Sequence, residues 1–461
     1  CIRDRRIFDK KNEEFEMKDK KILALLTEGK EFTHEQLTII IRGINVELPI
    51  EKIKIYADPK FDHRQMQEIE LGIEHGLSID QIMVYTNPAF CADTYKCNNQ
   101  MQQIRIGFEK GLTMSQVRLY ADPKFESGQM LQIRKGLENG LSENQIKIYA
   151  DPKFDFNQMD RIRFGFEEGL TLEQTRVYAD PKFDFEEMRQ VITGFINNLP
   201  IEQVKIYADP KFNADQMFEM RLGFESGLAE EQVKTLANPK FTENQMYEIR
   251  KGLEENLSLE QIRIYAIPYF TVEQMREMRW GFEHELNKEE VLLYADPKFD
   301  DHKMNEIRLG LEEFYKGMLT IEQVHIFAVP DFTATQMQEI RRGFVNGLQT
   351  EDVLLYADSK LSDEEMKSIR KLLEEGMQHI DLYKNALIHY NLLGIPEERA
   401  KVLAEAAHKG VSINKLDVIA KGHFTAEQTE FLISNIQKNT NEKRPDNKNR
   451  TNRDAQTIRD I

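Results

Sequence analysis

A six-residue motif, Tyr-Ala-Asp-Pro-Lys-Phe, recurs along the chain and limits the folds that it can adopt. The complete motif begins at Tyr56, Tyr120, Tyr149, Tyr178, Tyr207 and Tyr294. Complete and altered copies together place their prolines at Pro59, Pro88, Pro123, Pro152, Pro181, Pro210, Pro239, Pro268, Pro297 and Pro330. Seven of the nine intervals between successive prolines are 29 residues long. A fixed period of this length indicates a repeat array.

Each repeat predicts two helices. In the first, helix A, apolar residues such as Met130, Ile133 and Leu137 form one face at helical spacing. A Ser, Thr or Asp followed three residues later by Gln predicts a capping box at its start, and Gly or Asn ten residues after the Met predicts a left-handed end. A second capping box, Ser142 with Gln145, predicts a short helix B. The Asp-Pro of the motif ends helix B, so the motif is a turn between helix pairs.

A glycine in the middle of helix A recurs in every regular repeat, as at Gly194 and Gly223. In this position Gly costs about 1 kcal/mol of helix stability relative to Ala. We therefore expect a close approach of a neighbouring helix, which only a residue without a side chain permits.

Two-helix repeats of this size cannot bury their apolar faces alone, so they must stack into an all-α fold, an α-solenoid. We expect the regular array over residues 32–379 and degenerate repeats acting as a cap over 380–437. A charged lead-in helix is expected over 1–31 and a disordered polar tail over 438–461. Glu70 in place of Arg and Ser359 in place of Pro indicate terminal, capping-like repeats.

Charge and cysteine content restrict the function. The chain carries 62 Lys and Arg against 79 Asp and Glu, a net charge of -17, which opposes binding to nucleic acid or acidic membranes. No apolar run approaches the roughly 20 residues that span a bilayer. Three cysteines are too few for a disulfide framework and fit a reducing cytoplasm. Because the chain begins at Cys1, we expect a fragment; a lipid-modified N-terminal cysteine is the alternative.

The repeat reads YADPKFD, then QM.EIR.G.E.GL, then EQV.IYADPKF, with dots for variable positions. It resembles a tandem helical repeat of uncharacterised bacterial proteins that often accompany phage and conjugative-element genes. The match covers roughly residues 32–377. The resemblance implies a repeat scaffold and a place in mobile-element biology, and it brings no catalytic or binding residues with it.

Two positions of helix A vary freely between repeats, the first and the fifth residue after the Met, and they share one helix face. Aromatic and basic residues gather there, a composition typical of interface hot spots. We predict a partner-binding face made of Phe164, Phe218, Leu222, Tyr247, Lys251, Arg276 and Trp280. The alternative is that this face packs partly against the neighbouring repeat.

A nearly constant arginine stands four residues after the Met and forms a second candidate site. As the alternative phosphate-contacting residues we name Arg134, Arg163, Arg221, Arg250, Arg279 and Arg308. A solenoid could present this column to a phosphate backbone at regular pitch. Most of these arginines have a Glu four residues later, a spacing that forms helix-surface ion pairs, so a structural role is favoured.

Catalytic motifs are absent: the sequence has no phosphate-binding glycine loop, no HExxH and no GxSxG. Cys91, Cys97 and His63 lack zinc-site spacing, and we expect free surface cysteines. We predict a monomeric, cytoplasmic, non-enzymatic scaffold that binds a protein or peptide, without cofactor or metal. The alternatives are a nucleic-acid-associated solenoid accessory protein of a mobile genetic element, and an enzyme whose catalytic domain lies outside this chain.

Overall fold

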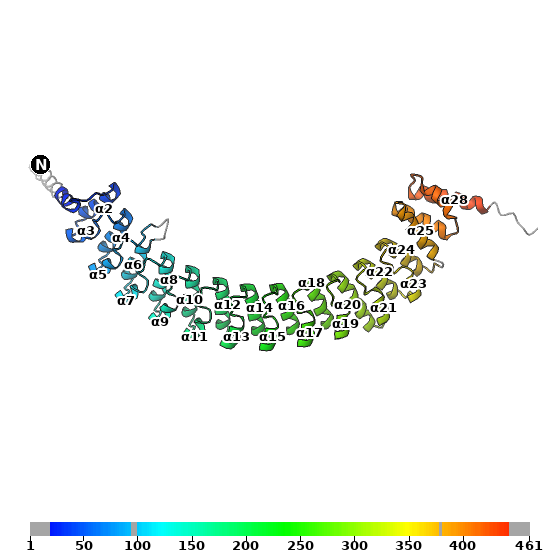
Figure 1. The fold of residues 1–461 in the computed structure, drawn as a ribbon, viewed down its shortest axis with the longest axis horizontal. Coiled ribbons are helices and arrows are strands. Elements are labelled where there is room, and N and C mark those ends of the chain that lie inside the picture. Colours follow the sequence, from blue (N-terminus) through cyan, green and yellow to red (C-terminus); the bar gives the residue numbers. More distant parts are fainter. Residues whose placement is uncertain (1–18, 94–98, 378–379, 442–461) are drawn as a thin grey trace, which may run out of the picture. The chain divides into compact units, whose positions relative to one another are not determined.

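The structure, a computed structural model, describes residues 19–93, 99–377 and 380–441. These residues form helices and the turns between them, and none of them lies in a strand (Figure 1). The chain divides into two compact units, Cys1–Arg250 and Lys251–Ile461, here called the N-terminal unit and the C-terminal unit. Within each unit, helices that follow one another in the sequence pack together. The predicted all-α repeat fold is confirmed.

The N-terminal unit begins, within the described residues, with a helix over 19–27. Its A helices are α2 (His34–Asn45), α4 (His63–Glu74), α6 (Gln100–Glu109), α8 (Ser127–Glu138), α10 (Phe156–Glu167), α12 (Phe185–Ile196) and α14 (Ala214–Glu225). Its B helices are α3 (Ile50–Tyr56), α5 (Ile79–Tyr85), α7 (Met114–Val117), α9 (Glu143–Tyr149), α11 (Leu172–Thr175), α13 (Ile201–Tyr207) and α15 (Glu230–Lys234). Helix α16 (Glu243–Glu254) contains the boundary between the units.

In the C-terminal unit the A helices are α18 (Val272–Glu283), α20 (Asp301–Tyr315), α22 (Ala334–Val345) and α24 (Asp363–Glu374). The B helices are α17 (Leu259–Tyr265), α19 (Lys288–Leu292), α21 (Ile321–Phe327) and α23 (Thr350–Leu354). The unit ends with α25 (Ile380–Leu392), α26 (Glu397–His408), α27 (Ile413–Ala420) and α28 (Ala426–Asn441).

Helix α28 continues to Asn441, into the tail that is predicted to be disordered from 438. The rest of that tail, from 442 onward, lies outside the described residues, as do residues 1–18 of the predicted lead-in helix.

The predicted helix ends are present. At the start of α9, the Ser142 hydroxyl accepts from the Gln145 N–H and the Gln145 side chain accepts from the Ser142 N–H. Gly140 has a φ of 84° and Asn198 a φ of 64°, the left-handed conformation expected where helix A ends. These local signals mark the ends of the helices that carry them.

The glycine in the middle of helix A makes room for the tyrosine of helix B. A β-carbon on Gly72 would stand 1.9 Å from the hydroxyl oxygen of Tyr85, a fully buried residue. The predicted close approach is therefore confirmed. Its source is the tyrosine that opens the recurring motif, packed against its own repeat's helix A.

The glutamine of the helix A capping box also joins neighbouring repeats. Gln65 Oε1 accepts from the Asp62 N–H at 2.9 Å, while its Nε2 donates to the carbonyls of Phe90 at 2.7 Å and Pro88 at 3.1 Å. The same pair of donations recurs at Gln36, Gln100, Gln129, Gln158, Gln216 and Gln336. Each of these A helices thereby fixes the turn that precedes the next A helix.

Candidate functional site

Four aromatic rings of the predicted partner-binding face lie at the surface. Phe164, Phe218 and Tyr247, in the N-terminal unit, are 36%, 37% and 40% exposed, and Trp280, in the C-terminal unit, is 36% exposed. The other predicted residues are half-buried: Leu222, Lys251 and Arg276. The predicted face has residues in both compact units, with Phe164, Phe218, Leu222 and Tyr247 in the N-terminal unit and Lys251, Arg276 and Trp280 in the C-terminal unit.

Arginines of the column lie against most of these rings. In the N-terminal unit, Arg221 Cζ is 5.2 Å from the Phe218 ring centroid and Arg250 Cζ is 5.4 Å from that of Tyr247. In the C-terminal unit, Arg308 Cζ is 5.6 Å from the Trp280 ring. These are cation–π distances, so each ring has a defined place while one side of it stays open to solvent.

The arginines themselves belong to bridges between neighbouring A helices. Arg221 Nε donates to Gln190 Oε1 on α12 at 3.2 Å, and its Nη1 donates to Glu225 on its own helix. Glu225 also accepts from Asn197 Nδ2, at the end of α12, at 2.7 Å. The bridge joins two residues of each helix and holds the two helices in register.

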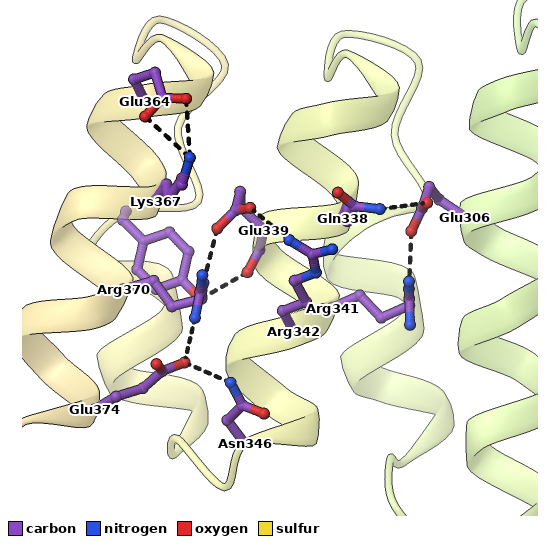
Figure 2. Close-up of polar contacts among 11 residues, drawn as sticks. Glu306, Gln338, Glu339, Arg341, Arg342, Asn346, Glu364, Lys367, Arg370 and Glu374 are labelled. Atoms are coloured by element: carbon purple, nitrogen blue, oxygen red, sulfur yellow. Dashed lines mark hydrogen bonds and ion pairs between the residues drawn. The ribbon is translucent and has the colours of Figure 1, made fainter.

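Figure 2 shows the same bridge between α22 and α24 in the C-terminal unit. Arg370 donates to Glu339 at 2.8 Å and to Glu374 at 2.6 Å, and Glu374 accepts from Asn346 at 2.8 Å. Between other neighbouring A helices the same donation links Arg105 to Glu68, Arg134 to Gln103, Arg163 to Gln132, Arg250 to Glu219, Arg308 to Glu277 and Arg341 to Glu306.

This geometry gives no support to the phosphate-contacting alternative. The alternative named six arginines, of which Arg134, Arg221, Arg250 and Arg308 are buried and Arg163 and Arg279 are half-buried. Arg134, Arg163, Arg221, Arg279 and Arg308 each pair with the Glu four residues later. A guanidinium already engaged by a carboxylate has few N–H groups left for a phosphate. The predicted ion pairs within each helix are present, and Arg134, Arg163, Arg221 and Arg308 also donate to a side chain of the preceding A helix.

Two glutamates that accept from arginines of the column, Glu109 and Glu312, are held in their ionised form, whereas burial raises the pKa of Glu277, the acceptor of Arg308 on the preceding A helix. Burial alone would raise the pKa of Glu109, but hydrogen bonds and charge from His75 and Arg105 lower the pKa below its ordinary value. The pKa of Glu312 is lowered in the same way, against burial, by His284 and Arg308. Such groups stabilise a structure near neutral pH and are poor proton donors there.

The first pair of A helices reverses the charges. Glu70 is fully buried and pairs with Arg42 on α2, so the carboxylate stands where other repeats carry the arginine. The repeat of α2 and α3 is otherwise regular: Gly43 packs against Tyr56, and Gln36 contacts the next turn. Glu70 thus keeps an ion pair between the helices with the partners exchanged.

One pair of A helices in the N-terminal unit lacks the bridge. Between α10 and α12, the places of the acceptor, the arginine and its glutamate are held by Arg161, Ile192 and Ile196. Ile192 is buried, Ile196 is 41% exposed, and Arg161 is half-buried without a hydrogen bond or ion pair among the described residues. The signal for this departure is in the sequence, where Ile192 interrupts the arginine column.

The expectation of free cysteines is wrong for Cys91, which is disulfide-bonded. Its partner lies outside the described residues, as does Cys97. Spacing in the sequence did not predict the bond because the geometry of two thiols depends on the path of the loop that carries them. In the part of the chain that the structure describes, no cluster of three or more His, Cys, Asp or Glu side chains could hold a metal. No helix there has the length and apolarity to cross a bilayer.

The C-terminal unit has two cavities beside α25. One, of about 500 Å³, is lined by Leu382, His389 and Ile413 among others, and the second, of about 660 Å³, by Glu365 and Asn391 among others. Neither is lined by a residue of the predicted partner-binding face.

A comparison with models of known protein families found no match for the chain, and a comparison with curated proteins found none either. The function must therefore be argued from the surface itself.

Proposed function

We propose that the chain is a non-enzymatic scaffold that binds a protein or peptide partner along the variable face of helix A. The observation that carries this proposal is the pair Phe218 and Tyr247, whose rings are more than a third exposed while one side lies against a guanidinium. Trp280 repeats the arrangement in the C-terminal unit. Exposed aromatic rings beside arginine are typical of residues that dominate binding energy.

The fixed position of the rings supports binding. Arg221 is held by Gln190 and Glu225, so the Phe218 ring that lies on it has restricted freedom before a partner arrives. A side chain that is already ordered loses little conformational entropy on association. The face therefore presents apolar area at a small ordering cost.

The setting of the scaffold is also a proposal. We propose that the scaffold is monomeric and lies in the cytoplasm. The disulfide at Cys91 counts against a reducing compartment. The resemblance of the motif to repeats of phage and conjugative-element proteins supports a bacterial scaffold in mobile-element biology.

The test compares alanine variants for binding to one partner. The immobilised full chain captures partners from cell extract, mass spectrometry identifies them, and each is then purified and titrated. We expect Phe218→Ala and Trp280→Ala each to weaken binding by about tenfold or more, the effect of losing a hot-spot ring. Tyr269→Ala is the matched control, because Tyr269 is 61% exposed in the turn before α18, away from this face. Equal affinity of the partner for the wild type, Phe218→Ala, Trp280→Ala and Tyr269→Ala would contradict the proposal.

A further inference from the structure

The surface where the unbridged helices α10 and α12 meet has an unusual composition; it is here called the α10–α12 groove and is made of Arg161, Phe164, Ile192 and Ile196. The bridged pair α18 and α20 shows how these positions meet. There Arg308 contacts Glu277 and Glu312, and Trp280 lies against it.

Residues at the same distance from the Met of helix A hold equivalent places in different repeats, so this arrangement predicts the one in the α10–α12 groove. Arg161 holds the place of Glu277, Phe164 that of Trp280, Ile192 that of Arg308 and Ile196 that of Glu312. The four side chains therefore line one groove between two neighbouring A helices.

The groove leaves a cation without an acceptor. The chain carries 79 Asp and Glu, yet none of those that the structure describes pairs with Arg161. Asp160 and Glu167, on the same helix, are both engaged by Arg163. A half-buried guanidinium loses part of its hydration and gains no hydrogen bond in return.

The walls of the groove are apolar and open. Phe164 is 36% exposed and Ile196 is 41% exposed, and buried Ile192 lies between them in the register. In bridged pairs a glutamate holds the place of Ile196 and accepts a hydrogen bond from the arginine of the bridge, as Glu312 does from Arg308. Here an apolar side chain stands instead, so the groove offers one positive charge beside a strip of apolar surface.

We propose that the α10–α12 groove binds a partner segment in which an Asp or Glu lies next to a large apolar side chain. The carboxylate takes the place that a bridge glutamate has elsewhere and accepts from the Arg161 guanidinium, a geometry that favours two parallel hydrogen bonds. The apolar side chain packs against Ile192, between Phe164 and Ile196. This inference rests on the proposed function and gives the chemistry of the partner at one place.

A carboxylate fits better than a phosphate. A phosphorylated side chain carries a charge of about -1.5 to -2 near pH 7 and needs several donors. The groove supplies one guanidinium among apolar walls, and Arg189, the other arginine nearby in register, is engaged by Glu186 at 2.5 Å. A single negative charge flanked by apolar groups matches this surface.

The probe is a set of fluorescein-labelled nonapeptides with a central Glu flanked on each side by Leu, Ile, Phe or Trp, in a Gly-Ser background. Sibling peptides carry Gln in place of the Glu. We expect some Glu peptides to bind the full chain in fluorescence anisotropy, and their Gln siblings to bind about tenfold or more weakly, since a hydrogen bond to a charged group is being lost. Arg161→Gln should cause a loss of the same size.

A variant that restores the bridge is the matched control. Arg161→Gln, Ile192→Arg and Ile196→Glu together give the α10–α12 groove the residues that Gln190, Arg221 and Glu225 provide between α12 and α14. We expect this protein to keep the wild-type helical circular dichroism and to lose peptide binding. If it does not fold, the result with Arg161→Gln alone decides.

Three outcomes would overturn the inference: no peptide binds, the Gln siblings bind equally, or Arg161→Gln binds as the wild type does. Self-association of the chain that the bridge-restoring variant abolishes would overturn it too, by assigning the groove to a second copy. Partner binding that responds to Phe218→Ala but not to Arg161→Gln would remove this inference and leave the proposed scaffold function standing.

Discussion

The hydroxyl of Tyr207 lies against the backbone of Gly194, where a β-carbon on residue 194 would stand 1.9 Å from the hydroxyl oxygen. At the equivalent Gly223, Leu236, in the turn after helix α15, replaces the tyrosine, and the nearest side-chain atom would be Val233 Cγ2 at 3.3 Å. Two glycines at the same helix position therefore differ only in what faces them.

Gly194→Ala should destabilise the N-terminal unit by about 1 to 3 kcal/mol, the usual cost of forcing an added methyl group into a packed site. Gly223→Ala should range from neutral to about 1 kcal/mol stabilising, because alanine favours the helix and meets only a tight van der Waals contact. Urea denaturation of the full chain, followed by circular dichroism, compares the two. Tyr207→Leu should relieve most of the loss in Gly194→Ala, and equal losses at both glycines would contradict the account.

A second prediction concerns Glu187, which stands where most repeats carry the glutamine that contacts the next turn. An ionised carboxylate has no hydrogen to donate to the carbonyls of Pro210 and Phe212, the acceptors at that place in the register. Glu187→Gln should therefore raise the free energy of unfolding by about 1 kcal/mol near neutral pH. The control is Glu186→Gln, which removes the same charge at a half-buried neighbouring residue whose carboxylate pairs with Arg189 instead of lying at the place of the glutamine.

The pH dependence of Glu187→Gln gives an independent check. Burial raises the pKa of Glu187, so the folded protein holds this proton more tightly than the unfolded chain. The stabilisation from the protonated carboxyl is present at low pH and is lost as the pH rises from the ordinary glutamate pKa through the raised pKa. The wild type should therefore lose stability relative to the variant as the pH rises above the ordinary glutamate pKa. Parallel stability curves would count against the raised pKa.

The bridge itself can be tested with two arginines on successive A helices. Arg221→Met leaves Gln190 and Glu225 without their shared donor and should cost about 3 kcal/mol, the lower end for breaking a buried charge pair. Arg189→Met removes an arginine side chain that is 52% exposed and paired only with Glu186, and should cost no more than about 1 kcal/mol. Unfolding midpoints in urea decide, and comparable losses would show that the bridge adds nothing to a surface ion pair.

We expect the arginine column not to bind nucleic acid. Its guanidinium groups are engaged by carboxylates, and the chain has a net charge of -17. Titration against labelled single- and double-stranded DNA and RNA at about 50 mM and 200 mM salt covers the range over which phosphate contacts weaken steeply. Tight binding at the lower salt that disappears at the higher would restore the nucleic-acid alternative.

The sequence predicted the parts of the fold that depend on local signals. Each repeat contains its own capping box, such as Ser142 with Gln145, and its own left-handed helix end, such as Gly140. The 29-residue period follows from the spacing of the prolines. Contacts between repeats were not predictable in the same way. The second role of Gln65 depends on carbonyls 23 and 25 residues later, and a helical wheel does not show which neighbouring backbone a side chain reaches.

For the candidate site as well, the sequence predicted which side chains are exposed but not the contacts that they make between repeats. The exposed positions of Phe218 and Trp280 follow from comparing the repeats with one another. The acceptor of Arg221 on the preceding A helix does not, because it lies 31 residues away at Gln190. Once that pairing is known, Arg161 and Ile192 stand out as two linked departures in one place.

The contact between Gln65 and the turn at Phe90 also bears on how such a chain changes length over generations. Most A helices carry the same glutamine donor, and the turns that follow present the same backbone acceptors, so repeats that share this contact can follow one another in any order. After recombination that removes or duplicates a whole repeat, the glutamine still lies opposite the carbonyls of a following turn. An insertion of another length preserves this contact only if the added residues lie in a loop. Genes for this architecture should therefore vary among related strains mainly by whole repeats.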